Sequence, residues 1–303
     1  MLGIGDDGAI VRPDADRELV IVIDTMVEGV HYPAGLDPSD IGYRAVAVNL
    51  SDIAAMAARP RWMTLALTLA SDDAGWLDGF SRGLFEAADE FSVPLIGGDT
   101  TRGDQTVITV QITGDVMPSK ALRRSGAKPG DDIYVTGTPG DAAAGLALWQ
   151  SNTVRNENQR QLLRRFARPA PRVALAGELA SHASAAIDVS DGLFADIEKL
   201  LVASGAGGVI ELDDLPLSVP LVAVQGKASA IELALGGGDD YELIFTAAPA
   251  QAPAIAEMAK RSSVAVRKIG SVSKGDALHC VKGGREFAYR HAGYRHFAET
   301  SDD

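Results

Sequence analysis

Five short acidic clusters, most of them beside glycine, constrain this chain more than any other feature. Apolar segments that stop at Asp beside Gly are typical of carboxylates held at strand ends by tight turns. Each cluster alone is better explained as an ordinary surface turn, because Asp-Gly pairs are common turn formers. As a set they favour a shared site. They are GIGDDGA (3–9), AVNLSD (47–52), LIGGDTT (95–101), AIDVSDGL (186–193) and LGGGDDYEL (235–243), and Asp24 follows the apolar run 19–23.

Carboxylates brought together repel each other unless a cation lies among them. Mg²⁺ suits such a site, because it binds oxygen ligands, keeps several waters and shares phosphate oxygens with substrates. The clusters therefore predict a site with several metal ions for a phosphorylated ligand.

Composition narrows the classes of protein that remain. The 303 residues are 46% hydrophobic and carry a net charge of −13. These values predict a packed core and disfavour nucleic-acid binding, which needs basic patches. Cys280 is the one cysteine in the sequence, which excludes an internal disulfide. The N-terminus does not resemble a signal peptide and the apolar runs are too short to cross a bilayer, so we expect a cytoplasmic protein without membrane partners.

Hydrophobic periodicity predicts alternating strands and helices, and hence an α/β or α+β fold. In the first half we expect a buried strand at 19–23 and a short strand at 93–96 that delivers Gly97, Gly98 and Asp99. We also expect a helix with Asp40 as its N-cap that runs to about Ala57, with Ile41, Ala45, Val48 and Ile53 on one side. The other expected elements include a helix at 76–91 and strands at 106–116, 133–136, 185–189, 242–246, 264–272, 278–281 and 286–289. Segment 117–130, rich in Gly, Pro, Lys and Arg, predicts a domain boundary. We expect an N-terminal domain over 1–120 and a C-terminal domain over 121–303, with the site between them because both carry acidic clusters.

Several catalytic motifs are absent from the sequence. It has no P-loop, no complete G-x-G-x-x-G, no G-x-S-x-G and no H-E-x-x-H. Phosphoryl transfer fits what remains, because it depends on positioning and charge neutralisation more than on covalent help from the protein. The glycines at 97–98 and 236–238 can cradle phosphates with backbone N–H groups, and Arg124 is the best candidate cation, although an exposed linker charge explains it about as well.

In this order, the motifs resemble those of the thiamine-monophosphate kinase family, within the superfamily of aminoimidazole ribonucleotide synthetase. The resemblance runs from Gly3 to His291–Phe297. It implies transfer of a phosphate from ATP to thiamine monophosphate, several Mg²⁺ ions, and a homodimer in which two N-terminal sheets pair into a barrel. The segments that carry it are GIGDDGA, IDTMVEGVHY, AVAVNLSDIAAMAARP, LIGGDTTRG, RSGAKPGDDIYVTGTPGDAAAGL, AIDVSDGL and GGGDDYELIFT.

The resemblance also implies roles for individual residues. Metal ligation falls on Asp7, Asp24, Asp52, Asp99, Asp188 and Asp191. ATP contact falls on Gly98, Asp99, Arg124 and Ser190. Contact with thiamine monophosphate falls on His31, Asp239 and Tyr294.

General base catalysis is not required for this transfer. The attacking phosphomonoester has a second pKa of about 6 and is largely dianionic at neutral pH. We therefore expect direct in-line transfer with no phosphoenzyme. The cationic thiazolium of the substrate can stack on Tyr294, and Asp239 can pair with it or with the aminopyrimidine.

The chain departs from the family pattern at three points. Val22 and Ile23 stand where family members often have hydroxyl residues, which removes two potential metal ligands. Asp239 replaces the usual Glu, and the family's segment before GIGDD is missing, as expected for a misassigned start or a truncated chain. The alternatives are another ATP-using enzyme of the superfamily, such as aminoimidazole ribonucleotide synthetase, and a non-catalytic protein that binds nucleotide or metal.

Overall fold

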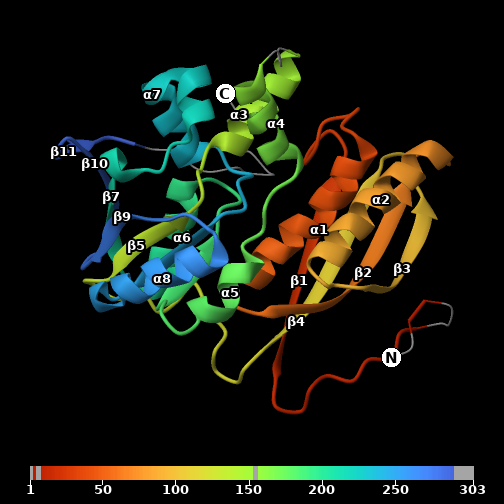
Figure 1. Cartoon of the computed structure of the whole chain (residues 1–303), viewed down its shortest axis with the longest axis horizontal. Coiled ribbons are helices and arrows are strands. Elements are labelled where there is room, and N and C mark those ends of the chain that lie inside the picture. The colour runs from red at the N-terminus through yellow and green to blue at the C-terminus, as the bar shows by residue number, and fades with distance from the viewer. Residues whose placement is uncertain (1–2, 5–7, 153–155, 290–303) are drawn as a thin grey trace, which may run out of the picture. The chain divides into compact units, whose positions relative to one another are not determined.

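A computed structural model describes residues 3–4, 8–152 and 156–289 (Figure 1). The chain divides into two compact units, which are described separately. Unit 1 comprises residues 1–123, 167–183 and 254–264, and unit 2 comprises 124–166, 184–253 and 265–303. Asp7 and Tyr294, two of the predicted site residues, lie outside the described residues.

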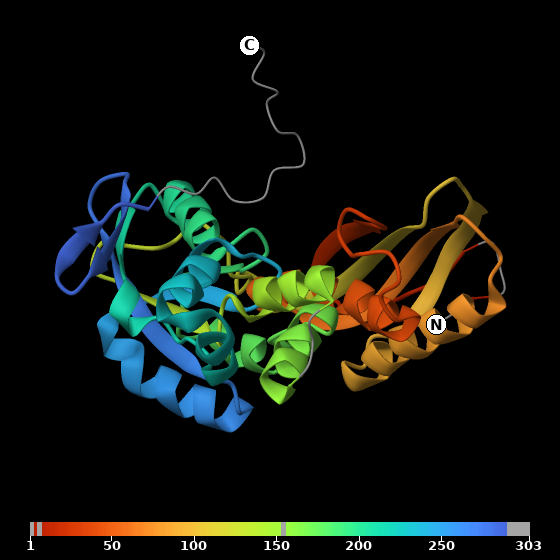
Figure 2. The same ribbon diagram turned by 90° about the horizontal axis from the view of Figure 1, so that it is seen from above.

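Unit 1 is built on a four-stranded sheet in the order β1-β4-β2-β3. The strands are β1 (Glu18–Val27), β2 (Arg59–Leu69), β3 (Leu95–Arg102) and β4 (Val107–Val116). β2 and β3 are parallel and are connected through α2 (Ala74–Glu90), whereas the β1–β4 and β2–β4 pairs are antiparallel. α1 (Pro38–Ala55) packs on β1, β4 and α2, and Figure 2 shows α1 and α2 on the same side of the sheet.

The start of α1 differs from the prediction. Asp37, not Asp40, is the N-cap, and its carboxylate accepts the Ser39 N–H at 2.8 Å. Pro38 follows at the first helical position, where its missing N–H costs nothing. The helix buries Ile41, Val48 and Ile53, as the periodicity predicted.

The prediction of a buried strand at 19–23 was wrong in two respects. β1 runs on to Val27, so Asp24 lies within the strand and not after it. Leu19, Ile21 and Ile23 are 43%, 67% and 63% exposed, because alternate residues of β1 point away from the helices. An unbroken apolar run therefore marked a strand covered on one face only.

The end of β3 also differs from the prediction. The acidic cluster LIGGDTT belongs to the strand itself, which extends from Leu95 to Arg102. Gly98 pairs with Leu65 of β2, and a Cβ at Gly98 would lie 2.0 Å from the Leu65 carbonyl oxygen. Close strand packing thus requires glycine at this position.

Arg168 anchors the segment 167–183 within unit 1. Its guanidinium bonds Asp40 of α1 at 2.5 Å, Glu86 of α2 at 2.7 Å and the Ser39 hydroxyl at 2.7 Å. The same group lies 5.0 Å from the centre of the Tyr43 ring. α5 (Val173–Leu179) follows and packs on α1 and β2.

Unit 2 holds a seven-stranded sheet in the order β11-β10-β7-β9-β5-β8-β6. β10 and β7 are parallel, and the other neighbouring strands are antiparallel. The sequence reading missed β7, whose two glycines weaken the strand pattern. The strands are β5 (Asp132–Thr136), β6 (Ala185–Asp188), β7 (Gly207–Glu211), β8 (Leu243–Ala247), β9 (Val266–Ser273), β10 (Leu278–Lys282) and β11 (Arg285–Phe287).

The core of unit 2 forms where α6 packs on β6, β7 and β8 and contacts α7. Ile133, Ile197, Leu200 and Ile244 are among its fully buried side chains. The further helices of the chain are α3 (Asp141–Ser151), α4 (Glu157–Ala167), α6 (Leu193–Ser204), α7 (Val219–Gly236) and α8 (Ala252–Ser262), with short helices at Leu212–Asp214 and Pro249–Gln251.

α7 was also missed by the sequence reading. It is the one helix of the described residues that is long and apolar enough to cross a membrane. However, Gly226 has φ 76° and ψ 157°, which interrupts the helix near its middle. Each part is consequently too short to span a bilayer.

Candidate functional site

In unit 1, Asp24 and Asp52 are held on neighbouring elements. The Asn49 side chain of α1 accepts the Asp24 N–H at 3.0 Å and donates to the Ala45 carbonyl at 3.0 Å. Asp52 lies one helical turn after Asn49 and so shares its face of α1. Burial raises the pKa of Asp24, so a nearby cation would stabilise its ionised form.

Asp99 lies on the other face of the same sheet. The register pairs Thr25 with Thr109, Thr109 with Ala66, and Ala66 with Asp99. The Thr25 and Thr109 hydroxyls are 2.8 Å apart, which confirms that paired residues share a face. Asp99 is therefore exposed on the face opposite to that of Asp24.

His31 follows β1 in a turn, half-buried. Its Nδ1 accepts the Val27 N–H at 3.0 Å. An accepting Nδ1 carries no proton, so the proton of the neutral ring is on Nε2. The ring therefore carries its hydrogen-bond donor at Nε2.

In unit 2, Asp188, Ser190 and Asp191 lie where β6 ends and the chain turns into α6. Asp188 is the last residue of β6 and is 5% exposed. The buried carboxylate of Asp196, on the first turn of α6, accepts the N–H groups of Ser190 and Asp191 at 3.0 Å each. This arrangement fixes the turn from inside the protein.

Lys199 joins two carboxylates of this turn. Its ammonium lies 2.5 Å from Asp191 Oδ2 and 2.7 Å from Asp196 Oδ1. Burial raises the pKa of Asp196, while the bonds to Lys199 act against that shift. The sequence reading singled out neither Asp196 nor Lys199, although their spacing after Asp191 on a helix was visible.

The turn 236–242 lies beside the turn 189–191. The Asp239 N–H donates to the Ser190 carbonyl and the Tyr241 N–H to the Val189 carbonyl, both at 2.9 Å. Gly238 has φ 68°, and a Cβ there would lie 2.7 Å from the Ser190 oxygen. Two acidic clusters about fifty residues apart in sequence are thus joined by backbone hydrogen bonds.

Behind Asp239 lies a buried acidic network that the sequence reading did not find. Glu242, which is fully buried, bonds Arg165 of α4 at 2.6 Å and the Thr136 hydroxyl at 2.6 Å. Asp240 accepts the N–H groups of Gly140 and Ala142 around the start of α3, at 2.7 and 3.2 Å. Burial raises the pKa of Asp240 to about 8.

Arg124 has an exposed side chain at the start of unit 2. Its carbonyl accepts the Ser204 hydroxyl at 3.0 Å, and the Ser204 oxygen accepts the Gly126 and Ala127 N–H groups at 3.1 Å. The end of α6 thus positions the backbone beside Arg124.

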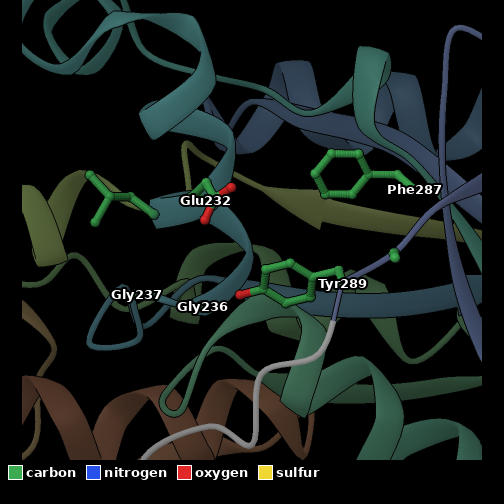
Figure 3. A pocket seen from close by; sticks show the side chains of 7 residues that line it. Glu232, Gly236, Gly237, Phe287 and Tyr289 are labelled. Atoms are coloured by element: carbon green, nitrogen blue, oxygen red, sulfur yellow. The ribbon is translucent and has the colours of Figure 1, made fainter.

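A cavity of about 460 Å³ opens beside the Gly236–Gly237 turn (Figure 3). The Tyr289 ring packs edge-on against Phe194, with centroids 5.1 Å apart, and Figure 3 shows its hydroxyl directed towards that turn. Burial raises the pKa of Tyr289 to about 12, so its hydroxyl stays protonated. One carboxylate, Glu232, and two aromatic rings, Phe287 and Tyr289, suit a flat or cationic ring.

Among the described residues, no group of three or more His, Cys, Asp or Glu side chains lies close enough to hold a metal ion by itself. The candidate ligands fall in twos on neighbouring elements. Asp24 of β1 is bonded through its N–H to Asn49, one turn before Asp52 on α1, and Asp188 and Asp191 lie at and just after the end of β6. Mg²⁺ is usually held by one or two carboxylates together with waters and substrate phosphates. The donor sets therefore fit Mg²⁺ better than a metal bound in an all-protein cage.

Comparison with known proteins identifies the family. The models for AIR synthase related protein match residues 5–116 with the N-terminal domain and 128–282 with the C-terminal domain. A thiamine-monophosphate kinase of Salmonella typhimurium is 44% identical over 299 residues, which cover 98% of this chain and 92% of the relative. The chain belongs to the thiamine-monophosphate kinase family.

Solved structures of thiamine-monophosphate kinases have the same fold. That from Stenotrophomonas maltophilia K279a is 43% identical, with a TM-score of 0.89 over 92% of this chain and 90% of the other. The structure of AaThiL complexed with AMPPCP and TMP is 31% identical, with a TM-score of 0.82 over 97% and 92% of the two chains. The resemblance to the family and its two-domain α/β fold are therefore confirmed.

Proposed function

We propose that this protein transfers the γ-phosphate of ATP to thiamine monophosphate and so forms thiamine diphosphate. The observation that carries the proposal is near full-length similarity to thiamine-monophosphate kinases, one of them complexed with AMPPCP and TMP. The candidate metal-binding carboxylates fit a transfer between two phosphates, which depends on charge neutralisation.

Mg²⁺ would be held by Asp24 and Asp52 in unit 1 and by Asp188 and Asp191 in unit 2, with Asp7 as a further ligand. Asp99 lies on the face of the unit 1 sheet opposite to Asp24, so it would bind a separate ion. When bound, Mg²⁺ offsets the repulsion between the two anionic phosphates. Val22 and Ile23 lie in β1 and bring only backbone oxygens to this region, so Asp24 carries the side-chain ligation from its strand.

Ser190, Arg124 and Gly98 with Asp99 are the proposed ATP contacts. Asp196 holds the Ser190–Asp191 turn open to a ligand by accepting two N–H groups from inside. Arg124 supplies an exposed guanidinium, which recognises phosphate oxygens through two parallel hydrogen bonds.

His31, Asp239 and Tyr294 are the proposed contacts with thiamine monophosphate. The Nε2–H of His31 suits the phosphate, and the carboxylate of Asp239 suits the cationic thiazolium or the aminopyrimidine. The cavity beside Gly236 offers a place for the ring end of the substrate. The dianionic phosphate attacks directly, so the transfer is in line and needs no general base.

The proposed assembly is a homodimer in which two unit 1 sheets meet. Its support is the outer face of β1, where Leu19, Ile21 and Ile23 are exposed side by side on alternate positions. Large apolar side chains grouped in this way mark an interaction surface. The four-stranded sheet of one chain is open, so a barrel would require the sheet of a second copy.

We also propose a division into two domains and a location, both expected from the sequence. One is the division into an ATP-binding and dimerisation domain over 1–120 and a C-terminal domain over 121–303. The other is the cytoplasmic location.

The test is formation of thiamine diphosphate from ATP and thiamine monophosphate, with and without Mg²⁺. We compare the wild type with Asp99→Asn and with the matched control Asp104→Asn, an exposed carboxylate in the next turn. We expect Mg²⁺-dependent product, a loss of about 100-fold or more in kcat for Asp99→Asn, and little change in the control. A folded wild type that binds ATP but forms no product would instead favour a non-catalytic relative.

A further inference from the structure

The turn Asp239–Glu242 alternates between outward and inward side chains. Asp239 and Tyr241 are half-exposed, whereas Asp240 and Glu242 are 1% and 0% exposed. The two outward residues have φ values of 63° and 51°. The left-handed region is unfavourable for residues with a side chain, and it persists only where the surroundings over-determine the conformation.

The inward side chains provide that constraint. Asp240 is tied to the N–H groups of Gly140 and Ala142, and Glu242 is tied to Arg165 and Thr136. On the backbone, the Asp239 and Tyr241 N–H groups donate to the carbonyls of Ser190 and Val189. The turn is therefore fixed on both sides of Asp239 and Tyr241.

The outward side chains are bonded to each other. The Tyr241 hydroxyl donates to Asp239 Oδ1 at 3.2 Å. A backbone held in place leaves the Asp239 side chain with two torsions to set, and this hydrogen bond restrains both of them.

We propose that Tyr241 is a positioning residue, which fixes the carboxylate of Asp239 for the cationic or aminopyrimidine end of the substrate. The inference rests on the proposed function and on Asp239 as the substrate contact. Tyr241 acts through Asp239 and makes no essential contact with the substrate. Its loss weakens recognition of thiamine monophosphate and leaves recognition of ATP intact.

The experiment is a double-mutant cycle with Tyr241→Phe, Asp239→Ala and the combined variant, measuring KM for both substrates, kcat and the melting temperature. Tyr134→Phe is the matched control, because the Tyr134 hydroxyl also donates to an Asp two residues earlier, Asp132, at 3.4 Å. Tyr134 lies in β5, is buried, and is not among the residues assigned to the site.

We expect Tyr241→Phe to raise KM for thiamine monophosphate about 3- to 10-fold, the effect of losing one ordinary hydrogen bond. KM for ATP and the melting temperature should stay unchanged, as should both KM values in Tyr134→Phe. In the Asp239→Ala background, Tyr241→Phe should have no further effect, because the group it orients is gone.

Two results would overturn the positioning role. One is an unchanged KM for thiamine monophosphate in Tyr241→Phe, and the other is the same increase in the Asp239→Ala background, which would show direct contact with the substrate. A wild type that forms no thiamine diphosphate would overturn the proposed function together with this inference. If the wild type forms thiamine diphosphate, an unchanged KM in Tyr241→Phe overturns the positioning role alone.

Discussion

The sheets of the two units are covered to different extents. In unit 2, every residue of β5, β6 and β8 is buried, so these strands are covered on both faces. In unit 1, β1 alternates between buried and exposed residues, and its outer face carries Leu19, Ile21 and Ile23. These strands of unit 2 therefore expose no face to solvent, whereas β1 of unit 1 presents an exposed apolar face.

The candidate residues follow the same division. In unit 2 they lie on turns that buried carboxylates hold from inside, as Asp196 holds Ser190 and Asp191. In unit 1 the three aspartates lie within a helix and strands, with Asp24 and Asp99 on opposite faces of one sheet. His31 is the exception, in the turn after β1. The site of unit 2 is preorganised by side-chain bonds, and that of unit 1 by the sheet.

The largest expected effect comes from opening the enclosed sheet. Phe245 of β8 is fully buried and stacks on Tyr134 with centroids 5.1 Å apart. Phe245→Ala should lower the free energy of unfolding by about 3–5 kcal/mol. Ile23→Ala, on the exposed face, should change it by no more than about 0.5 kcal/mol in dilute protein. Urea denaturation of both variants checks this contrast, and equal losses would contradict it.

A comparable effect is expected from the buried ion pair of unit 2. Arg165→Met leaves Glu242 charged and without its cation in a fully buried position. The loss in unfolding free energy should be about 3 kcal/mol. The combined variant with Glu242→Gln should recover part of this loss, because it removes the uncompensated charge. If the double variant loses as much unfolding free energy as the two single variants together, Arg165 and Glu242 are not coupled.

A smaller effect is expected on association through unit 1. Ile21→Glu introduces a charge on the exposed face of β1 and should raise the dissociation constant of the proposed dimer about 10- to 100-fold. Sedimentation at several concentrations measures the change. Val202→Glu, at an exposed apolar position of α6 in unit 2, is the matched control. Dimers that are equally stable in both variants would place the interface elsewhere.

The last prediction concerns pH. The folded protein keeps the Asp240 proton up to about pH 8, whereas the unfolded chain loses it near the ordinary value of 3.8. The folded state thus binds more protons between these values, so this contribution to stability is present at low pH and falls as pH rises towards 8. Asp240→Asn should flatten the decline. Denaturation midpoints of the wild type and of Asp240→Asn at pH 5 and pH 8 measure this decline. If the midpoint falls by the same amount in both proteins, the assignment to Asp240 is wrong.

The sequence predicted the elements with strong periodicity. α2 and β4 lie within one or two residues of their expected bounds, and so do most strands of unit 2. It misplaced the ends of β1 and β3, because apolar runs and glycine pairs look alike in a strand and beside one. It missed β7 and α7, where glycines interrupt the pattern.

The candidate site was predictable only as a set of motifs. The acidic clusters indicated Asp188, Asp191 and Asp239, but not the hydrogen bonds that join their turns. Asp240 and Glu242 looked like further members of an acidic cluster, and only burial separates them from Asp239 and Tyr241. The alternation of exposed and buried side chains along this turn is set by tertiary packing, because its positive φ values depend on the surrounding contacts. No local sequence pattern encodes those contacts.

The most direct test of the proposed kinase activity follows the phosphate itself. In a single turnover with Mg²⁺, thiamine monophosphate and ATP labelled in the γ-phosphate, all transferred label should appear in thiamine diphosphate, with none on the protein at any time. Label on the protein before product would contradict direct transfer. Label released only as inorganic phosphate would contradict the kinase assignment.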